Sequence, residues 1–419
     1  MADDKPNPCD QQDEERKVRL KRWTQEILRF HQTPEEIASG LRLHVIGQGE
    51  GVRAVAALLR RQMRRLQRAI ERNPDRVWPG PPGESTPTLL IGPTGCGKTL
   101  LVRTLAKIAG LPYVIEDATS MSETGYYGRS VHNMLEQLAS RADPLISMTQ
   151  ATHGIAAIDE VDKVARRPGG RASGTIDVSR EGVQRSLLAL LDGSVMQIEW
   201  PPGASAGVRT YVPFPTAGLM LILMGAFEGL DEIVRRRLRG RRSMGFGAPV
   251  ETSEASQRHD ILRHVVPDDL VAFGIMPELV GRLRDVVVMQ ALSRDDLRRI
   301  LVEAPEGPLA VVQRAAALER FRFSLSDRLV EAILDEAMAT GLGARALHAI
   351  VTRLTRGVFF AVPGRISPEA DDEYVVTLDM EALGDPTCFG IEYRQVQEKA
   401  GRRRRRTGIV VPDDLEAEA

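Results

Sequence analysis

Residues 92–99, with the sequence Gly-Pro-Thr-Gly-Cys-Gly-Lys-Thr, are of the types that bind phosphate groups. The glycines let backbone N–H groups turn toward an anion, and the positive end of a following helix dipole adds to the attraction. In such a loop, Lys98 would reach the β- and γ-phosphates and the Thr99 hydroxyl would ligate Mg²⁺. The spacing matches the P-loop pattern at every fixed position, so the sequence predicts a nucleoside triphosphate site. The predicted nucleotide contacts here are Gly92, Pro93, Thr94, Gly95, Cys96, Gly97, Lys98, Thr99 and Leu100.

A second pair of chemically active residues, Asp159 and Glu160, follows the apolar run 154–158. A buried strand that delivers Asp-Glu at its carboxyl end is the Walker B arrangement. The Asp of that arrangement holds Mg²⁺ and the Glu polarises the attacking water. An Asp-Glu pair alone would carry no information, but with a P-loop upstream the two roles require each other. We therefore expect Thr99 and Asp159 to ligate Mg²⁺ and Glu160 to be catalytic.

A parallel sheet covered by helices would position both motifs. The P-loop lies between the apolar run 88–91 and the amphipathic segment 100–109, which predicts a strand, a loop and a helix. Further apolar runs at 113–115, 154–158 and 219–223 alternate with helical patterns, while residues 201–216 are expected to form a loop. This alternation predicts an α/β fold.

Residues 286–292 mark a change in composition that we interpret as a domain hinge. Beyond it the pattern is mostly helical, with strand-like runs at 321–324 and 374–378. The sequence thus predicts a large α/β domain and a smaller, mostly helical α+β domain. The expected boundaries are 1–32 for a polar, partly disordered extension ending in one short helix, 33–289 for the large domain, 290–393 for the small domain and 394–419 for a charged, disordered tail.

Composition narrows the class of protein. A chain of 419 residues is long enough for roughly two or three domains. The net charge of −1 gives no overall field that would recruit nucleic acid or an anionic membrane. The absence of a long apolar run or a signal-peptide pattern predicts a cytoplasmic protein without membrane contact. Cys9, Cys96 and Cys388 are far apart, which argues against a disulfide framework or a zinc site.

One face of a predicted helix over 52–72 is rich in arginine. An apolar stripe at helical spacing defines the opposite face. Such a basic face could bind nucleic acid, but a solvated or intersubunit surface is the favoured interpretation. The same holds for the arginine run 402–406, for which a solvated tail is favoured. The helix arginines are Arg60, Arg61, Arg64, Arg65, Arg68 and Arg72.

Several further motifs occur in a fixed order around these sites. With them, the chain from about residue 33 to about residue 392 resembles the AAA+ protein-unfolding ATPases, and most closely the ClpX family. HslU shares these motifs but has a long inserted domain for which this sequence has little room. The motifs are Thr33–Ile37 with Val45–Gln48, Asp117–Thr119 before Gly125–Gly128, Asp177–Gln184, Met276–Leu283 and Thr340–Arg345.

The resemblance implies an AAA+ P-loop NTPase and assigns further roles at the nucleotide. Val45 and Ile46 match the pair that packs against the adenine. Arg282 matches the arginine that reaches a neighbouring subunit's γ-phosphate, and Arg345 matches the sensor-2 arginine of the small domain. An arginine supplied by a neighbour implies a ring, by resemblance a homohexamer. Considered only as residues, either arginine could instead form a surface ion pair.

Two loops of the family handle protein partners. Tyr126-Tyr127-Gly128 matches the pore loop, whose flat aromatics can grip any polypeptide; a tyrosine pair in a core-facing turn is the alternative. Met244-Gly245-Phe246 matches the loop that docks on the ClpP peptidase, where Met in place of Ile could weaken docking; a local core plug is the alternative.

Three departures from the family are visible. Cys9 stands alone where ClpX has an N-terminal zinc domain, the basic pore-entrance loop keeps only Arg209, and Met224 occupies a position where the family has a small residue. We interpret Met224 as core packing. The resemblance implies an unfoldase driven by ATP and Mg²⁺, without zinc, that threads unfolded or tagged proteins for a ClpP-type peptidase. The alternative is an AAA+ remodelling ATPase not coupled to proteolysis, acting in partner assembly or as a nucleic-acid motor.

Overall fold

The structure is a computed structural model that describes residues 8–74, 77, 85–121, 130–166, 174–200, 210–241, 254–363, 373–384, 390–394 and 409–410. The chain divides into two compact units, one made chiefly of residues up to 291 and the other chiefly of residues from 292 onward. No helix of the described residues is long and apolar enough to cross a membrane.

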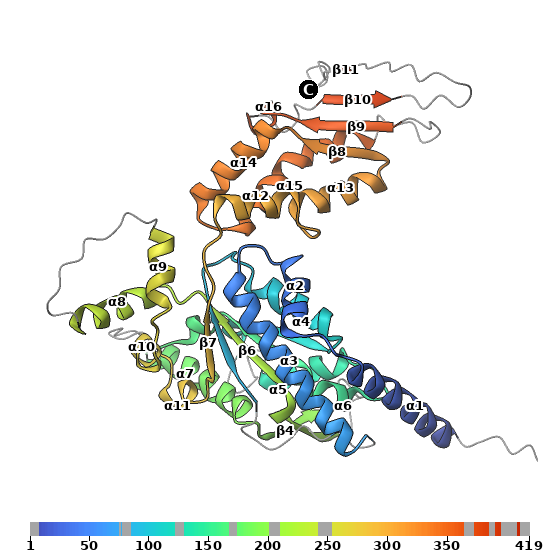
Figure 1. Cartoon of the computed structure of the whole chain (residues 1–419), viewed down its shortest axis with the longest axis vertical. Helices are drawn as coiled ribbons and strands as arrows, with labels where there is room; N and C mark the ends of the chain where they lie inside the picture. Colours follow the sequence, from blue (N-terminus) through green and yellow to red (C-terminus); the bar gives the residue numbers. More distant parts are fainter. Residues whose placement is uncertain are drawn as a thin grey trace, which may run out of the picture. The chain divides into compact units, whose positions relative to one another are not determined.

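A five-stranded parallel sheet forms the centre of the first unit (Figure 1). Its strand order is β2-β3-β6-β1-β7, and the P-loop strand β1 pairs with β6 and β7. All four pairings are parallel, so the carboxyl ends of the strands meet at one edge. This arrangement confirms the predicted α/β class. The strands are β1 (Thr88–Ile91), β2 (Tyr113–Asp117), β3 (Ile155–Asp159), β6 (Met220–Gly225) and β7 (Asp285–Val288).

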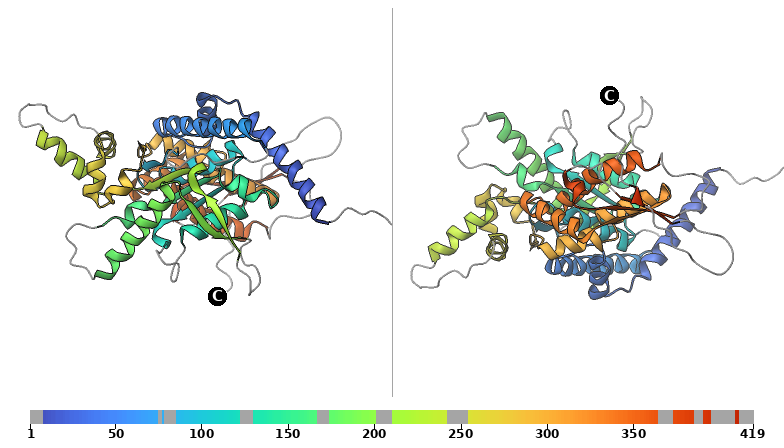
Figure 2. Two further views of the ribbon diagram at one scale, coloured as in Figure 1. Left: turned by 90° about the horizontal axis from the view of Figure 1, so that it is seen from below. Right: turned by 90° about the horizontal axis from the view of Figure 1, so that it is seen from above.

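Helices cover both faces of this sheet (Figure 2). Alternate strand residues such as Leu89, Ala156 and Leu221 pack into one buried core with α5 and α7. On the other side, α4 contacts β2 and β3, and α3 contacts β7. The helices of this unit are α1 (Pro8–Leu28), α2 (Pro34–Arg42), α3 (Gly49–Arg72), α4 (Lys98–Ala109), α5 (Val131–Ser140), α6 (Ser147–Ala151), α7 (Gly174–Leu191), α8 (Leu230–Arg241), α9 (Glu254–Leu262), α10 (Pro267–Phe273) and α11 (Pro277–Val280).

The helices near the amino terminus follow the sequence signals. Thr33 caps α2 by accepting a hydrogen bond from Glu36 N (3.3 Å), and Glu36 accepts one in return from Thr33 N (2.7 Å), which is a capping box. The apolar stripe predicted for α3 is buried, with Val52, Val55, Ala56, Leu59, Met63, Leu66 and Ile70 each no more than 1% exposed.

Some elements differ from the predictions. Helix α1 is longer than the short helix expected. Trp23 and Ile27 are buried, and ion pairs such as Lys17–Glu14 and Arg22–Glu26 support the charged remainder of the helix. The region interpreted as a hinge contains β7, whose apolar run pairs with β1. The second half of the predicted loop 201–216 contains β5 (Tyr211–Pro215), which forms an antiparallel hairpin with β4 (Val195–Glu199).

The second unit packs helices against a small mixed sheet of order β11-β10-β9-β8, in which β8 and β9 are parallel. The prediction of an unstructured tail omits β11, which pairs with β10. Its core includes Leu329, Ile333, Leu347 and Leu354, each no more than 1% exposed. The elements are α12 (Arg294–Val302), α13 (Pro308–Leu318), β8 (Phe321–Leu325), α14 (Asp327–Thr340), α15 (Ala344–Ala361), β9 (Glu373–Leu378), α16 (Glu381–Gly384), β10 (Gly390–Arg394) and β11 (Ile409–Val410).

Candidate active site

The P-loop connects β1 to α4 at the carboxyl edge of the sheet. Gly95 and Gly97 have φ angles of +75° and +100°, a left-handed region that only glycine adopts without strain. Gly97 is the residue at which the loop turns into α4, so the free N–H groups of the helix begin at Lys98. Lys98 is buried, and its Nζ donates to the carbonyls of Gly92 (2.6 Å) and Pro93 (3.0 Å).

Thr99 and Asp159 meet across the gap between α4 and β3. The Thr99 hydroxyl donates to Asp159 Oδ2 at 2.9 Å. An octahedral Mg²⁺ with ligands at 2.0–2.1 Å holds neighbouring oxygens about 2.9 Å apart, and it prefers carboxylate and hydroxyl oxygens. The two residues therefore fit the predicted ion both in chemical type and in separation.

Glu160 follows Asp159 in an unusual backbone conformation. Its φ is +57°, and its N–H donates to Asp159 Oδ1 at 2.9 Å. Left-handed conformations of residues other than glycine are uncommon and gather at functional sites. Burial is the main cause that raises the pKa of Glu160, and the negative charges of Asp117, Asp159 and Asp162 raise it further, while Lys163 opposes them.

The acidic character of this edge comes from strand register. Asp117 and Asp159 are the last residues of β2 and β3 and are paired neighbours in the sheet. Asp162 lies directly after them in the 3₁₀ turn Val161–Val164 and is 8% exposed. A carboxylate edge beside a loop of N–H donors suits a phosphate ester that is accompanied by a divalent cation.

Asp162 is a site residue to which the sequence analysis gave no role. Its Oδ1 accepts a hydrogen bond from Ala226 N (3.2 Å), just after β6. A Cβ added at Gly225 would lie 2.6 Å from the same Oδ1, so only glycine fits there. The neighbouring Met224 is fully buried, which confirms its interpretation as core packing. The motif Asp159-Glu160-Val161-Asp162 contained the only sequence signal for this contact.

Val45 lies beside the P-loop. A Cβ built on Gly97 would be 3.8 Å from Val45 Cγ1, and Val45 and Ile46 are both buried. Gln48 anchors this segment to the end of β7, because its Nε2 donates to Gln290 O (2.8 Å) and its Oε1 accepts from Gln290 N (3.1 Å). The contact with adenine remains a prediction for Val45 and Ile46, and the structure places an apolar wall next to the phosphate loop.

Comparisons with known proteins agree with this geometry. A family model described as "AAA domain (Cdc48 subfamily)" matches residues 84–286. The ATP-dependent Clp protease ATP-binding subunit ClpX of Bacteroides thetaiotaomicron is 34% identical over 346 residues, which are 83% of this chain and 80% of that protein. The chain belongs to the ClpX family of AAA+ ATPases. It is therefore an ATP-hydrolysing enzyme.

The two arginines assigned from the ClpX family lie in different units. Arg282 follows α11 in the first unit, is half exposed, and its Nε lies 2.7 Å from Asp192 Oδ1. Arg345 is exposed in the first turn of α15 in the second unit. The surface ion pair considered for such an arginine is thus present for Arg282, and the predicted roles of both at the nucleotide remain predictions.

The predicted protein-handling loops of the ClpX family lie outside the described residues. Tyr126, Tyr127 and Gly128 fall between residues 121 and 130, and Met244, Gly245 and Phe246 fall between residues 241 and 254. Among the described residues, no group of three or more His, Cys, Asp or Glu side chains could hold a metal ion.

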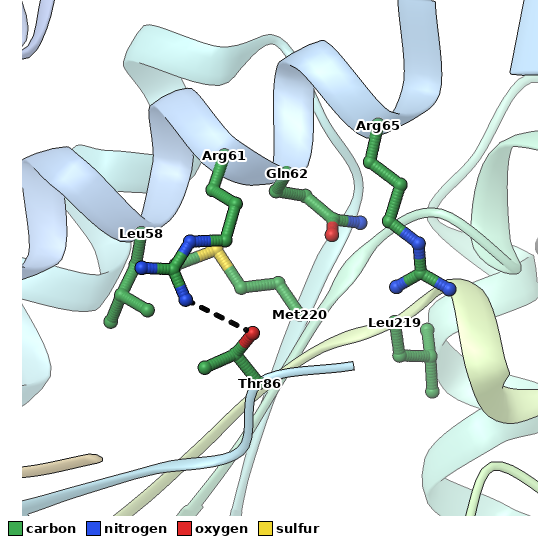
Figure 3. Close-up of a pocket in the computed structure, with 7 residues that line it drawn as sticks. All are labelled: Leu58, Arg61, Gln62, Arg65, Thr86, Leu219 and Met220. Carbon is green, nitrogen blue, oxygen red and sulfur yellow. Dashed lines mark hydrogen bonds between the residues drawn. The ribbon is translucent and has the colours of Figure 1, made fainter. Parts of the chain in front are cut away.

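Arg61 and Arg65, from the arginine-rich face of α3, lie at the opposite, amino edge of the sheet (Figure 3). Arg65 Nη2 donates to Ala217 O (2.8 Å), Gln62 Nε2 to Gly218 O (2.5 Å) and Arg61 Nη1 to Thr86 Oγ1 (3.4 Å). These side chains line a small pocket together with Leu58, Leu219 and Met220. Arg61 and Arg65 thus bind the chain itself, whereas the sequence favoured a solvated or intersubunit surface for the whole face.

Proposed function

We propose that the protein is an ATP-dependent unfoldase that works as a homohexameric ring, threads polypeptide through its pore and delivers it to a ClpP-type peptidase. The observation that carries the proposal is the Thr99–Asp159 contact beside Glu160, because it joins the P-loop and Walker B motifs into one hydrolysis site. Membership in the ClpX family supports the general function of an ATP-dependent unfoldase or chaperone.

In this proposal, Lys98 neutralises phosphate charge, and Thr99 and Asp159 hold Mg²⁺. The ion, when bound, supplies charge stabilisation at the phosphates. Glu160 orients the attacking water and accepts its proton at a carboxylate oxygen, for which a raised pKa makes it a better base. Arg282 completes the site of a neighbouring subunit and Arg345 contacts the nucleotide of its own chain.

Polypeptide would be gripped by Tyr126 and Tyr127, with Gly128 giving the loop its backbone freedom. Met244, Gly245 and Phe246 would dock in an apolar pocket of the peptidase. A nucleic-acid motor is the less favoured alternative, since Arg61 and Arg65 of the basic helix are engaged within the chain.

The test is ATP-dependent loss of fluorescence from a folded reporter protein that carries unstructured tails, with and without a ClpP-type peptidase. We expect loss of fluorescence with the wild type and with Tyr126→Phe, and none with Glu160→Gln or Tyr126→Ala. Brisk ATP hydrolysis without any unfolding would contradict the proposal and favour a remodelling ATPase. Degradation of the reporter by the peptidase that is unchanged in Phe246→Ala would refute the docking role.

A further inference from the structure

The turn that follows β6, Gly225–Phe227, is tied to the hydrolysis site by two backbone contacts. Gly92 N donates to Gly225 O at 3.1 Å, which joins the turn to the first residue of the P-loop. Ala226 N donates to Asp162 Oδ1 at 3.2 Å, which joins it to the segment after Glu160. A shift of this turn would therefore displace both the P-loop and the segment that follows Glu160.

The turn is strained and cannot be expected to hold its shape alone. Phe227 is fully buried and has a φ of +50°. A left-handed conformation is unfavourable for a bulky residue and persists only where the surroundings enforce it. The aromatic ring of Phe227 packs against Phe273, with centroids 5.1 Å apart, and Phe227 O accepts a hydrogen bond from Leu230 N (3.1 Å). The carbonyl of Ala226 needs a further donor, and Phe227 O can accept a second one.

Arg258 of helix α9 pairs those carbonyls. Its Nη2 donates to Ala226 O (3.1 Å) and to Phe227 O (3.2 Å), and its Nε lies 3.4 Å from Asp231 Oδ1 of α8. Helices α8 and α9 lie together on the side of the first unit away from α1 (Figures 1 and 2). The Arg258 side chain is 27% exposed, so its contacts are largely shielded from water. A planar guanidinium can hold two acceptors and a carboxylate in one fixed arrangement, which a lysine cannot do.

We propose that Arg258 is a positioning residue for ATP hydrolysis. It holds the strained turn so that Ala226 N stays on Asp162, and this contact fixes the backbone that carries Glu160 two residues earlier. Its hydrogen bonds go to the turn and its ion pair to Asp231, so it acts through the turn and not on the nucleotide. The proposal concerns the hydrolysis step and is independent of peptidase delivery.

The test compares Arg258→Met with Arg263→Met in the full-length protein. Arg263 lies just beyond the end of α9 and makes a half-exposed ion pair with Glu50 (3.6 Å), so it is a matched control. We expect Arg258→Met to lower kcat about tenfold while KM and the Kd for ATP stay within about twofold, since small misplacement of a catalytic group costs rate more than binding. Arg258→Lys should recover only part of kcat, and Arg263→Met should match the wild type.

A kcat of Arg258→Met within about twofold of the wild type would overturn the proposal. A parallel loss of ATP affinity, or an identical loss in Arg263→Met, would also overturn it, because either outcome indicates a general structural role. If Arg258→Met does not yield folded protein by thermal melting, Arg258→Gln takes its place, with an intermediate fall in kcat expected. Wild-type kcat in that variant would again refute the role.

Discussion

The carboxyl and amino edges of the five-stranded sheet both carry polar side chains, and they hold them in different ways. At the amino edge, Gln62 and Arg65 donate to the backbone carbonyls of residues 217 and 218. At the carboxyl edge, burial and the charges of Asp117, Asp159 and Asp162 raise the pKa of Glu160. One edge satisfies its polar groups within the chain, and the other gathers charge that suits a cation and a phosphate ester. The difference separates groups that stabilise the fold from groups that do chemistry.

The largest effect should come from Lys98→Ala at the carboxyl edge. Lys98 is the buried cation of the P-loop, and its removal takes away the charge that meets the phosphates. We expect ATP hydrolysis to fall at least about 100-fold, as for loss of other preorganised charges at a reacting centre. A steady-state phosphate-release assay measures this, with Lys107→Ala in the last turn of the same helix as control. Hydrolysis within a few fold of wild type in Lys98→Ala would contradict the assignment of the carboxyl edge as the site of chemistry.

The second largest effect should be on the Mg²⁺ requirement of hydrolysis, through Asp159. Asp159→Asn keeps a similar shape but weakens the charge beside Thr99 Oγ1. The Mg²⁺ concentration for half-maximal hydrolysis should rise about tenfold or more, in line with other changes around bound metals. Titration of hydrolysis with Mg²⁺ at saturating ATP measures it, and Asp143→Asn, which alters a carboxylate paired with Arg19 far from the P-loop in sequence, is the control. An unchanged Mg²⁺ requirement would show that Asp159 is not a ligand.

At the amino edge the expected effect is on stability. Gln62→Met removes a buried donor and leaves Gly218 O without that partner, which should cost about 1–3 kcal/mol of unfolding free energy. Chemical denaturation measures this cost, and kcat per folded molecule should stay at the wild-type value. A fall in kcat without a fall in stability would mean that the amino edge takes part in the chemistry.

The smallest effect should follow replacement of the exposed arginines Arg64, Arg68 and Arg72 by Gln. Exposed charged residues contribute little to stability, so the unfolding free energy should change by less than about 1 kcal/mol. Hydrolysis should be unchanged, and added duplex DNA should stimulate neither the wild type nor the triple variant. Salt-sensitive stimulation by DNA that is lost in the variant would instead support the nucleic-acid motor.

The P-loop and Walker B residues could be predicted because their roles require particular residue types at short, fixed spacings in the sequence. Gly97 must adopt a positive φ before α4, and Asp159 must end an apolar strand. The sequence of each motif therefore predicts the local backbone conformation around it. The α/β alternation predicted a sheet covered by helices, but the strand order β2-β3-β6-β1-β7 came only from the structure.

Contacts between residues far apart in sequence could not be predicted in this way. Gln48 forms hydrogen bonds with Gln290, and Arg258 donates to the turn after β6. No local sequence pattern indicates either contact. Strand β7 was interpreted as a hinge because a four-residue apolar run is too short to distinguish from a linker. Helix α1 exceeded its prediction because its first half is charged, with an ion pair between Lys17 and Glu14, and has no apolar period to signal a helix.

The measurement that tests the central claim most directly is ATP binding and hydrolysis by Glu160→Gln. We expect wild-type ATP affinity with hydrolysis at least about 100-fold slower, since Glu160 acts on water and not on the nucleotide. Without nucleotide or Mg²⁺, the variant should melt no lower than the wild type at pH 7. A raised folded-state pKa means that the stability contribution of Glu160 is full below its ordinary pKa and is lost as the pH rises through the raised value. Wild-type hydrolysis by Glu160→Gln would contradict the assignment of this edge as the active site.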